Sequence, residues 1–227
     1  MSLARGLSKI AWATALAAGG AVIGHAALQT EDGRELDENL FKALNAEHGE
    51  TVDRFFAGIT ELGSMYAAAA AAGALALAGR RREGARALTA AGATWLVLQG
   101  MKRLVDRPRP FLADPEGTRR MIAEPHGTSW PSSHPAVLTT FTRVAARELG
   151  IRAFGRTALS GLDASVAASR VALGVHYPSD VASGLLFGRA VARLWPRAPR
   201  SRPRPAPLTR APRRYGDSPS QHPEHHR

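Results

Sequence analysis

The chain has 227 residues, a length that suits one compact domain better than two, and 44% of them are hydrophobic. It has no cysteine, which excludes disulfide scaffolds, cysteine–zinc sites and thiol nucleophiles. The net charge of +11 is unevenly spread, because residues 196–227 hold 8 arginines, 2 acids and 8 of the 15 prolines. The basic character therefore belongs largely to the C-terminal tail, and the mean hydropathy of −0.17 averages that tail with very apolar stretches.

The first apolar stretch covers residues 10–28, and His25 is its one strongly polar member. Arg5 and Lys9 precede it, so the pattern fits either a cleaved signal peptide or an uncleaved membrane helix. We favour an uncleaved first helix, because a signal peptide usually has a shorter apolar core and because later apolar segments also need a membrane.

Residues 31–54 form a polar connection that contains eight acidic residues. Apolar side chains recur there at helical spacing and predict an amphipathic surface helix; they are Leu36, Leu40, Phe41 and Leu44. Two more apolar stretches follow at residues 55–78, which end in an alanine-rich run, and at 87–101. Three less apolar helix candidates complete the series, at residues 135–149, 157–173 and 180–195.

The predicted fold class is all-α, a polytopic helical bundle with six transmembrane helices. We divide the chain into residues 1–54, a first membrane helix with its acidic outer connection, residues 55–195, a helical core, and residues 196–227, a Pro/Arg-rich tail. The composition of the tail predicts disorder.

Charged residues in the last three helix candidates allow two interpretations. They lie either on solvated or interfacial helix faces, or in a bundle interior. In the second case Asp163 would pair with Arg143 or Arg189, because charges inside a membrane tend to pair.

The distribution of arginine orients the chain in a membrane. With six spans and a cytoplasmic N-terminus, the inner segments are 79–86, 147–156 and the tail, all rich in arginine, while the acidic residues 31–54 fall outside. This matches the positive-inside rule. The basic loop at residues 102–130 is the exception, because the same topology places it outside, and its charge needs another reason.

Three segments at the predicted outer helix ends supply that reason. The first segment runs from Lys102 to Arg109. The second is the Pro-Ser-Ser-His run that ends at His134, and the third is a Ser-Arg pair followed by His176 and Asp180. Their polar members are Lys102, Arg109, Ser132, Ser133, His134, Arg170, His176 and Asp180.

These residue types suit a phosphate. Lysine and arginine side chains match phosphate oxygens, and the free N–H groups of a helix that begins at Ser132–Ser133 favour an anion. An aspartate bonded to one ring nitrogen of His176 would fix its tautomer and raise the nucleophilicity of the other nitrogen. Phosphoryl transfer depends mainly on positioning and charge stabilisation, so these groups suffice without a metal. Each segment alone has an ordinary alternative: a lipid-headgroup contact for the basic loop, and a helix cap for Ser-Ser-His.

Taken together, in this order and spacing, the segments resemble the type 2 phosphatidic acid phosphatase family, which shares its site with vanadium haloperoxidases and bacterial acid phosphatases. The family pattern is Lys, six residues, Arg-Pro; then Pro-Ser-Gly-His; then Ser-Arg, five residues, His, three residues, Asp. The chain departs from it at Ser133, where the family usually has glycine. The family uses the backbone N–H of that residue, which serine retains. The resemblance covers residues 55–195.

The resemblance implies a role for each residue. His176 would attack phosphorus to give a phosphohistidine, with Asp180 orienting its ring. His134 would protonate the leaving oxygen and later activate water. The phosphate oxygens would be held by Lys102, Arg109, Ser132, Ser133 and Arg170. The resemblance implies no cofactor and no metal, and vanadate, a mimic of the transition state, should inhibit.

The expected substrate is a lipid phosphate or diphosphate monoester, of the phosphatidic acid type or an isoprenyl diphosphate, met at the outer membrane surface. The expected localisation is the cell membrane, multi-pass, with the site on the extracytoplasmic face. Two alternatives use the same pocket: a non-catalytic phospholipid-binding member and a lipid phosphotransferase. A haloperoxidase is less favoured, because those relatives are larger and soluble. The tail is expected to contact anionic lipid rather than nucleic acid.

Overall fold

The computed structural model describes residues 3–198, in which the chain forms nine α-helices, one short 3₁₀ helix at Glu61–Gly63, and no strand. The helices are α1 (Leu3–Gln29), α2 (Glu31–Leu44), α3 (Glu50–Thr60), α4 (Met65–Leu77), α5 (Arg81–Lys102), α6 (Pro110–Ala113), α7 (Ser133–Glu148), α8 (Ala153–Ala172) and α9 (Pro178–Leu194). The all-α prediction is confirmed for this part of the chain. The predictions made for the tail, residues 196–227, lie almost entirely outside the described residues.

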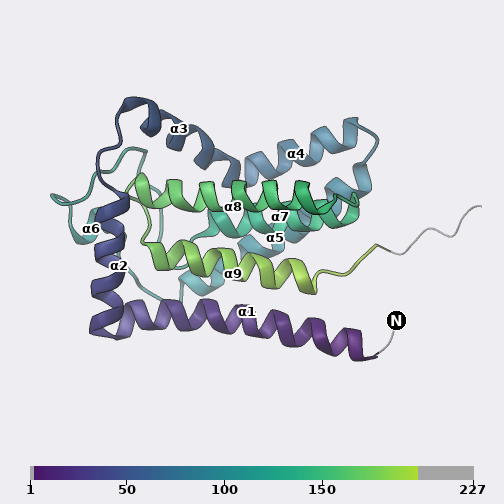
Figure 1. The fold of residues 1–227 in the computed structure, drawn as a ribbon, viewed down its shortest axis with the longest axis horizontal. Helices are drawn as coiled ribbons and strands as arrows, with labels where there is room; N and C mark the ends of the chain where they lie inside the picture. Colours follow the sequence, from purple (N-terminus) through teal and green to yellow (C-terminus); the bar gives the residue numbers. More distant parts are fainter. Residues whose placement is uncertain (1–2, 199–227) are drawn as a thin grey trace, which may run out of the picture. The chain divides into compact units, whose positions relative to one another are not determined.

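The long helices run along one axis of the compact unit, Met1–Arg197 (Figure 1). Helix α7 contacts α5, α8 and α9, and α1 packs along α9. Helix α2 turns across one end of this bundle (Figure 1). The end of α5, the start of α7, and the turn from α8 to α9 all lie at that same end, which positions the three sequence motifs together.

Small residues bring the central helices close together. A Cβ atom on Gly188 of α9 would lie 2.6 Å from the carbonyl oxygen of Ala136 on α7, so only glycine fits at this crossing. Near the same crossing, Thr94 of α5 and Thr140 of α7 share a buried hydrogen bond of 2.9 Å between their hydroxyl groups. The close approach leaves α7 with 11 buried residues, which makes it the core helix of the bundle.

The predicted single helix over residues 55–78 is wrong, because the structure breaks it in two. Helix α3 ends at Thr60, and α4 begins after Ser64, whose hydroxyl accepts from the backbone N–H of Ala67 at 3.0 Å. The turn between them presses against α7: a Cβ on Gly63 would lie 2.8 Å from the His134 Cβ atom. The break thus lets the chain pass close to the start of α7, which a continuous helix could not do.

The amphipathic helix predicted between residues 31 and 54 is present as α2. Its N-terminus is capped by Thr30, whose hydroxyl accepts from the backbone N–H of Gly33 at 3.1 Å. Phe41 and Asp37 face the bundle and are buried, but the three leucines of the predicted apolar face are exposed; they are Leu36, Leu40 and Leu44.

Asp163 lies in the bundle interior, 1% exposed, but it does not pair as the interior interpretation expected. Its carboxylate accepts from the Thr142 hydroxyl at 3.1 Å, and within residues 3–198 no ion pair joins it to Arg143 or Arg189. A neutral donor on the neighbouring helix α7 takes the place of the expected arginine.

Among the helices of residues 3–198, one, α1, is long and apolar enough over Gly6–Gln29 to cross a membrane, judged by length and composition. Met65–Leu77 is a shorter apolar helix. The count of six spans therefore stays a prediction. Helix α1 is tied into the bundle, because the Ser183 hydroxyl of α9 donates to the Gly20 carbonyl oxygen at 2.8 Å, and this favours the uncleaved first helix.

The contact between α7 and α9 predicts a stability difference between two glycine substitutions. Gly188→Ala forces a methyl group against the backbone of α7 and should lower the free energy of unfolding by about 1–3 kcal/mol. Gly161→Ala, in an open position on the exposed face of α8, is the matched control and should be neutral or stabilising by up to about 1 kcal/mol. Thermal unfolding in detergent measures both, and equal melting temperatures would contradict the packing argument.

Candidate functional site

His176 lies in the turn between α8 and α9 and is 2% exposed. The turn depends on Gly174, whose φ of +75° is a left-handed conformation that favours glycine. The Arg109 Nη1 atom is 3.2 Å from His176 Nε2. Because an arginine N–H can only donate, Nε2 is the acceptor and carries its lone pair toward Arg109.

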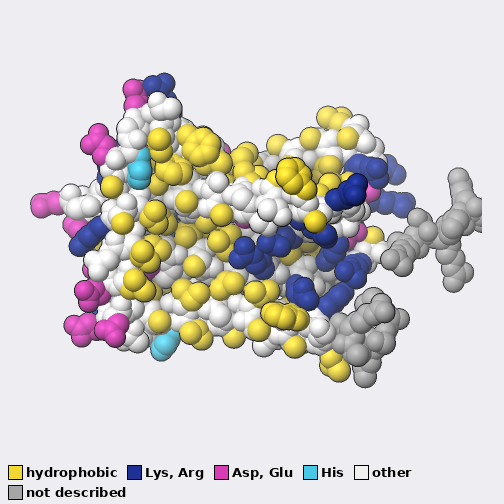
Figure 2. Space-filling model, in the orientation of Figure 1, with side chains coloured by type: hydrophobic (Ala, Val, Ile, Leu, Met, Phe, Trp, Pro, Cys, Tyr) yellow, Lys and Arg dark blue, Asp and Glu magenta, His cyan; other side chains and the backbone are white. Residues whose placement is uncertain are grey.

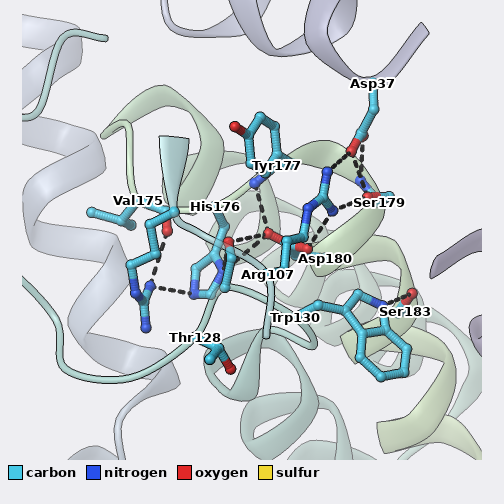
Figure 3. A network of polar contacts seen from close by, with 12 residues as sticks. Asp37, Arg107, Thr128, Trp130, Val175, His176, Tyr177, Ser179, Asp180 and Ser183 are labelled. Carbon is cyan, nitrogen blue, oxygen red and sulfur yellow. Dashed lines mark hydrogen bonds and ion pairs between the residues drawn. The ribbon is translucent and has the colours of Figure 1, made fainter. Parts of the chain in front are cut away.

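The Asp180 carboxylate lies on the other side of the same ring. Its Oδ2 atom is 3.4 Å from His176 Nδ1 and accepts from the Tyr177 backbone N–H at 2.9 Å (Figure 3). The Ser129 hydroxyl also donates to Oδ2. A carboxylate beside Nδ1 favours the tautomer that is protonated there, which leaves Nε2 unprotonated. The two sides of the ring thus indicate the same tautomer.

Arg107 contributes to the site, but the sequence analysis did not identify it. It is 6% exposed and donates at 2.7 Å to the Asp180 carboxylate, to the Ser179 hydroxyl and to the Asp37 carboxylate (Figure 3). Its guanidinium carbon also lies 4.1 Å from the centre of the Tyr177 ring. Its signal in the sequence was its place two residues before Arg109, within the same basic segment.

Asp37 of α2 was missed as well. It accepts from the backbone N–H of Ser179 at 2.8 Å and from the Ser179 hydroxyl at 2.6 Å. The acidic connection therefore supplies one buried carboxylate to the site. Its only sequence signal is weak: Asp37 is four residues before the buried Phe41, on the same face of a predicted helix.

Charge and burial set the protonation of the loop residues. Burial by itself lowers the pKa of Arg107, but the carboxylates of Asp180 and Asp37 outweigh it and leave that pKa raised. Burial, and then the positive charges of Arg109 and Arg170, hold the pKa of His176 well below its ordinary value. The His176 ring is therefore neutral, the state in which its nitrogen can act as a nucleophile.

Backbone carbonyl groups of residues 126–129 hold two of the predicted phosphate ligands. Lys102 Nζ donates to the Thr128 carbonyl at 2.6 Å, and Arg109 donates to the carbonyl groups of Gly127 at 2.9 Å and His126 at 3.1 Å. A further bond at 2.9 Å joins Arg109 to the Val175 carbonyl, next to His176. These contacts use neutral acceptors, so both cations keep their charge available for an anion.

Arg170 is 2% exposed near the end of α8, and its Nη1 atom donates to the Thr60 hydroxyl at 3.0 Å. Two buried polar atoms in this region have no hydrogen-bond partner among residues 3–198: Arg170 Nε and the Ser132 hydroxyl oxygen. Buried donors are normally satisfied, so both suit an oxyanion. The Ser132 backbone N–H already donates to the Asp180 carbonyl at 3.0 Å, which leaves the N–H groups from Ser133 onward for this purpose.

His134 is the second residue of α7, partly exposed, and packs against the Gly63 turn. It is near enough to His176 to be one of the groups whose charge lowers the pKa of that ring. The structure thus brings all eight predicted site residues to one end of the bundle. No group of three or more His, Asp or Glu side chains in the described residues could hold a metal ion.

Comparisons with known proteins find relatives that are named as phosphatases. The chain is 39% identical over 122 residues to decaprenylphosphoryl-5-phosphoribose phosphatase of Mycobacterium tuberculosis, covering 54% of this chain and 64% of that protein. It is 37% identical over 123 residues to the protein of the same name from Mycolicibacterium smegmatis, covering 52% and 62%. The chain therefore spans less than two thirds of the length of these relatives.

Two solved structures share the fold. Aquifex aeolicus LpxE has a TM-score of 0.61 and 24% identity, covering 69% of this chain and 92% of that one. The first transmembrane PAP2 type phosphatidylglycerolphosphate phosphatase from Bacillus subtilis has a TM-score of 0.62 and 20% identity, covering 79% and 92%. A family model described as the PAP2 superfamily matches residues 83–204, more than half of the chain and the range that contains all three motifs. The chain belongs to the PAP2 superfamily.

Proposed function

We propose that this chain is a membrane phosphatase that hydrolyses the phosphate monoester of a lipid-linked substrate through a phosphohistidine on His176, without a metal. The observation that carries the proposal is the position of the His176 ring. Its Nδ1 atom is 3.4 Å from the Asp180 carboxylate, and its Nε2 atom is 3.2 Å from the Arg109 guanidinium. That is a neutral nucleophile beside a phosphate-binding cation.

In the proposed reaction, the lone pair of Nε2 attacks phosphorus and the bond from phosphorus to the ester oxygen breaks. Burial and the positive charges of Arg170 and Arg109 lower the pKa of His134 to about 3 in the free protein, so we propose that His134 takes up its proton when the negative charge of the substrate phosphate is bound beside it. His134 then gives this proton to the leaving oxygen. It then takes a proton from water, whose oxygen attacks phosphorus, breaks the N–P bond and releases inorganic phosphate. The cations of Lys102, Arg109 and Arg170 stabilise the charge that develops on the phosphate oxygens.

The named activity of the relatives narrows the substrate class. Both mycobacterial proteins are named for a decaprenylphosphoryl-5-phosphoribose, which joins a polyprenyl lipid to a sugar phosphate. We propose a polyprenyl-linked phosphate monoester as the first substrate to test, ahead of phosphatidic acid, lysophosphatidic acid, phosphatidylglycerophosphate and isoprenyl diphosphates.

An apolar pocket supports a lipid substrate. It has a volume of about 430 Å³, lies between α1, α5 and α9, and is lined by Leu98, Met101 and Phe187 among others. Met101 directly precedes the phosphate ligand Lys102 in the chain. We propose that the hydrocarbon chain of the substrate occupies this pocket while its phosphate reaches His176.

The surface supports a membrane location. Large apolar side chains are exposed along several helices, including Val22 at 65%, Leu77 at 93% and Leu96 at 65%. Figure 2 shows acidic side chains gathered at the end of the molecule that carries α2, and basic ones toward the opposite end. By the positive-inside rule, the basic end is cytoplasmic and the His176 site is extracytoplasmic.

Replacing the nucleophile should abolish turnover. His176→Ala is expected to reduce phosphate release from a polyprenyl-linked phosphate monoester on the order of a thousandfold or more, because no covalent intermediate can form. His25→Ala, an exposed histidine on α1, is the matched control and should keep full activity. Phosphate release by detergent-purified protein in EDTA is the measurement; activity of His176→Ala within tenfold of the original, or loss of activity in EDTA, would reject the proposed mechanism.

The orienting role of Asp180 predicts a defect in kcat. Asp180→Asn removes the charge that favours the Nδ1–H tautomer, and kcat should fall at least about 100-fold with KM changed little. A normal melting temperature for the variant would show that the bundle is intact. A rise in KM with an unchanged kcat would instead make Asp180 a substrate-binding group.

The lowered pKa of His176 has a direct spectroscopic consequence. Because burial and nearby positive charge favour the neutral ring, it should stay unprotonated as the pH falls through about 6.5, where an ordinary histidine protonates. Nitrogen-15 NMR of histidine-labelled protein, with His176→Ala used to assign the signal, measures this. A His176 signal that titrates near pH 6.5 would contradict the buried neutral state.

A further inference from the structure

A second pocket lies away from the His176 site. It has a volume of about 380 Å³ and is lined by residues of α1, α7, α8 and α9 together with Arg197. Seven of its lining side chains are basic and one, Asp163, is acidic; the basic ones are Lys9, Arg143, Arg147, Arg156, Arg189, Arg193 and Arg197. Figure 2 shows a concentration of Lys and Arg side chains on the face of the molecule in view, toward the end opposite α2.

This pocket and the His176 site are at opposite ends of the same helices. Helix α7 begins at Ser133, beside the first site, and passes His134 thirteen residues before it reaches Arg147. At 1.5 Å per residue that separation is about 20 Å along the helix axis. Helix α9 likewise begins near His176 and reaches Arg189 and Arg193 only in its second half. A substrate phosphate held at His176 therefore cannot neutralise the second pocket.

Most of the positive charge in this pocket is not neutralised by carboxylates of residues 3–198. Arg147 pairs with Glu148 at 3.1 Å. Asp163 takes its hydrogen bond from Thr142, and within the described residues no ion pair involves Arg143, Arg156 or Arg189. Cations brought together without acids repel one another unless an anion binds between them.

Unsatisfied hydrogen-bond donors on the arginines also agree with an anion-binding pocket. The Nε atoms of Arg143 and Arg147 are buried and have no hydrogen-bond partner among residues 3–198. Arg143 makes a long contact of 3.4 Å with the Ser160 hydroxyl through its Nη2 atom. Guanidinium groups with free donors are suited to phosphate, which accepts several charge-assisted hydrogen bonds at once.

The surroundings of the pocket favour a lipid over a soluble anion. Leu16 and Leu159 line it together with the arginines, so its walls are partly apolar. Trp12 is 58% exposed on α1, and the Arg193 guanidinium lies 5.9 Å from the centre of its ring. Tryptophan and arginine side by side on exposed helices are typical of the headgroup level of a membrane. A pocket of this kind can hold a phosphate headgroup while the acyl chains lie against the neighbouring helices.

We propose that this pocket binds the phosphate headgroup of an anionic phospholipid from the leaflet opposite the active site, as a lipid site separate from the catalytic one. Arg143, Arg156 and Arg189 would contact the phosphate, and the bound lipid would join α1 to α7, α8 and α9 at this end of the bundle.

The test compares lipid binding by matched double variants of the full chain in a neutral detergent. Phosphatidylglycerol is the probe, because its phosphate is a diester that a monoester phosphatase does not cleave. Binding is followed by native mass spectrometry and by the shift in melting temperature. Arg156→Gln with Arg189→Gln should weaken the apparent affinity at least about tenfold, since two charge-assisted hydrogen bonds are lost.

Two controls separate the pocket from general charge and from the active site. Arg81→Gln with Arg82→Gln removes the same charge from exposed positions at the start of α5 and should leave the affinity unchanged. Lys102→Met, in the catalytic site, should also bind phosphatidylglycerol normally. The pocket variant itself should keep its activity on a soluble phosphate monoester, which shows that it folds.

Three outcomes decide the proposal. Selective loss of phosphatidylglycerol binding in the pocket variant supports it, provided that phosphatidylcholine binds weakly to all of the proteins. Equal binding by the two double variants overturns it. Stabilisation by inorganic phosphate that equals the effect of phosphatidylglycerol and disappears in the pocket variant also overturns it, because the site would then bind the free ion rather than a lipid.

Discussion

The structure of the catalytic end depends on the buried charge of Asp180. This carboxylate is fully buried, and an isolated charge in that position would be very costly. Its partners come from separate parts of the chain: Arg107 from the loop after α5, Ser129 from the segment before α7, and the Tyr177 backbone N–H from the start of α9. Satisfying one carboxylate therefore fixes three segments relative to one another.

Arg107 extends this constraint to α2. It carries one positive charge between two buried carboxylates, those of Asp180 and Asp37, and Asp37 in turn accepts two hydrogen bonds from Ser179. Through Asp180, the network contacts the Nδ1 side of the His176 ring, and the Nε2 atom on the other side faces Arg109. In the proposed mechanism Arg107 is thus a positioning residue, which acts on His176 through another side chain.

Positive charge is balanced by acidic side chains to different degrees at the two ends of the bundle. At the His176 end, buried cations are balanced partly by Asp180 and Asp37 and partly held by neutral carbonyl groups, so a limited positive charge faces a phosphate. At the other end, arginines outnumber acids around an open pocket. Helices α7 and α9, which pack closely at Gly188, connect the two ends. This arrangement agrees with the two phosphate sites proposed above.

The sequence by itself determined the family and the fold class. The spacing of the three motifs, from Lys102 to Asp180, predicted a phosphate site, and the hydrophobic pattern predicted an all-helical chain. It could do so because these features depend on residue type and local spacing. The sequence did not reveal the break at residues 61–63, because the turn there packs Gly63 against His134, which lies far along the chain on α7.

Only the tertiary structure decided which charges are partners. Asp37 and Ser179 are 142 residues apart in the chain, and nothing local in either segment indicates that they share a hydrogen bond. For the same reason the sequence did not show that Asp163 would accept a hydrogen bond from Thr142 rather than pair with an arginine. Nor did it show that Arg107 would be buried while Arg103, four residues earlier, is exposed. Residue type determines what a side chain can bind, but burial and long-range packing determine what it meets.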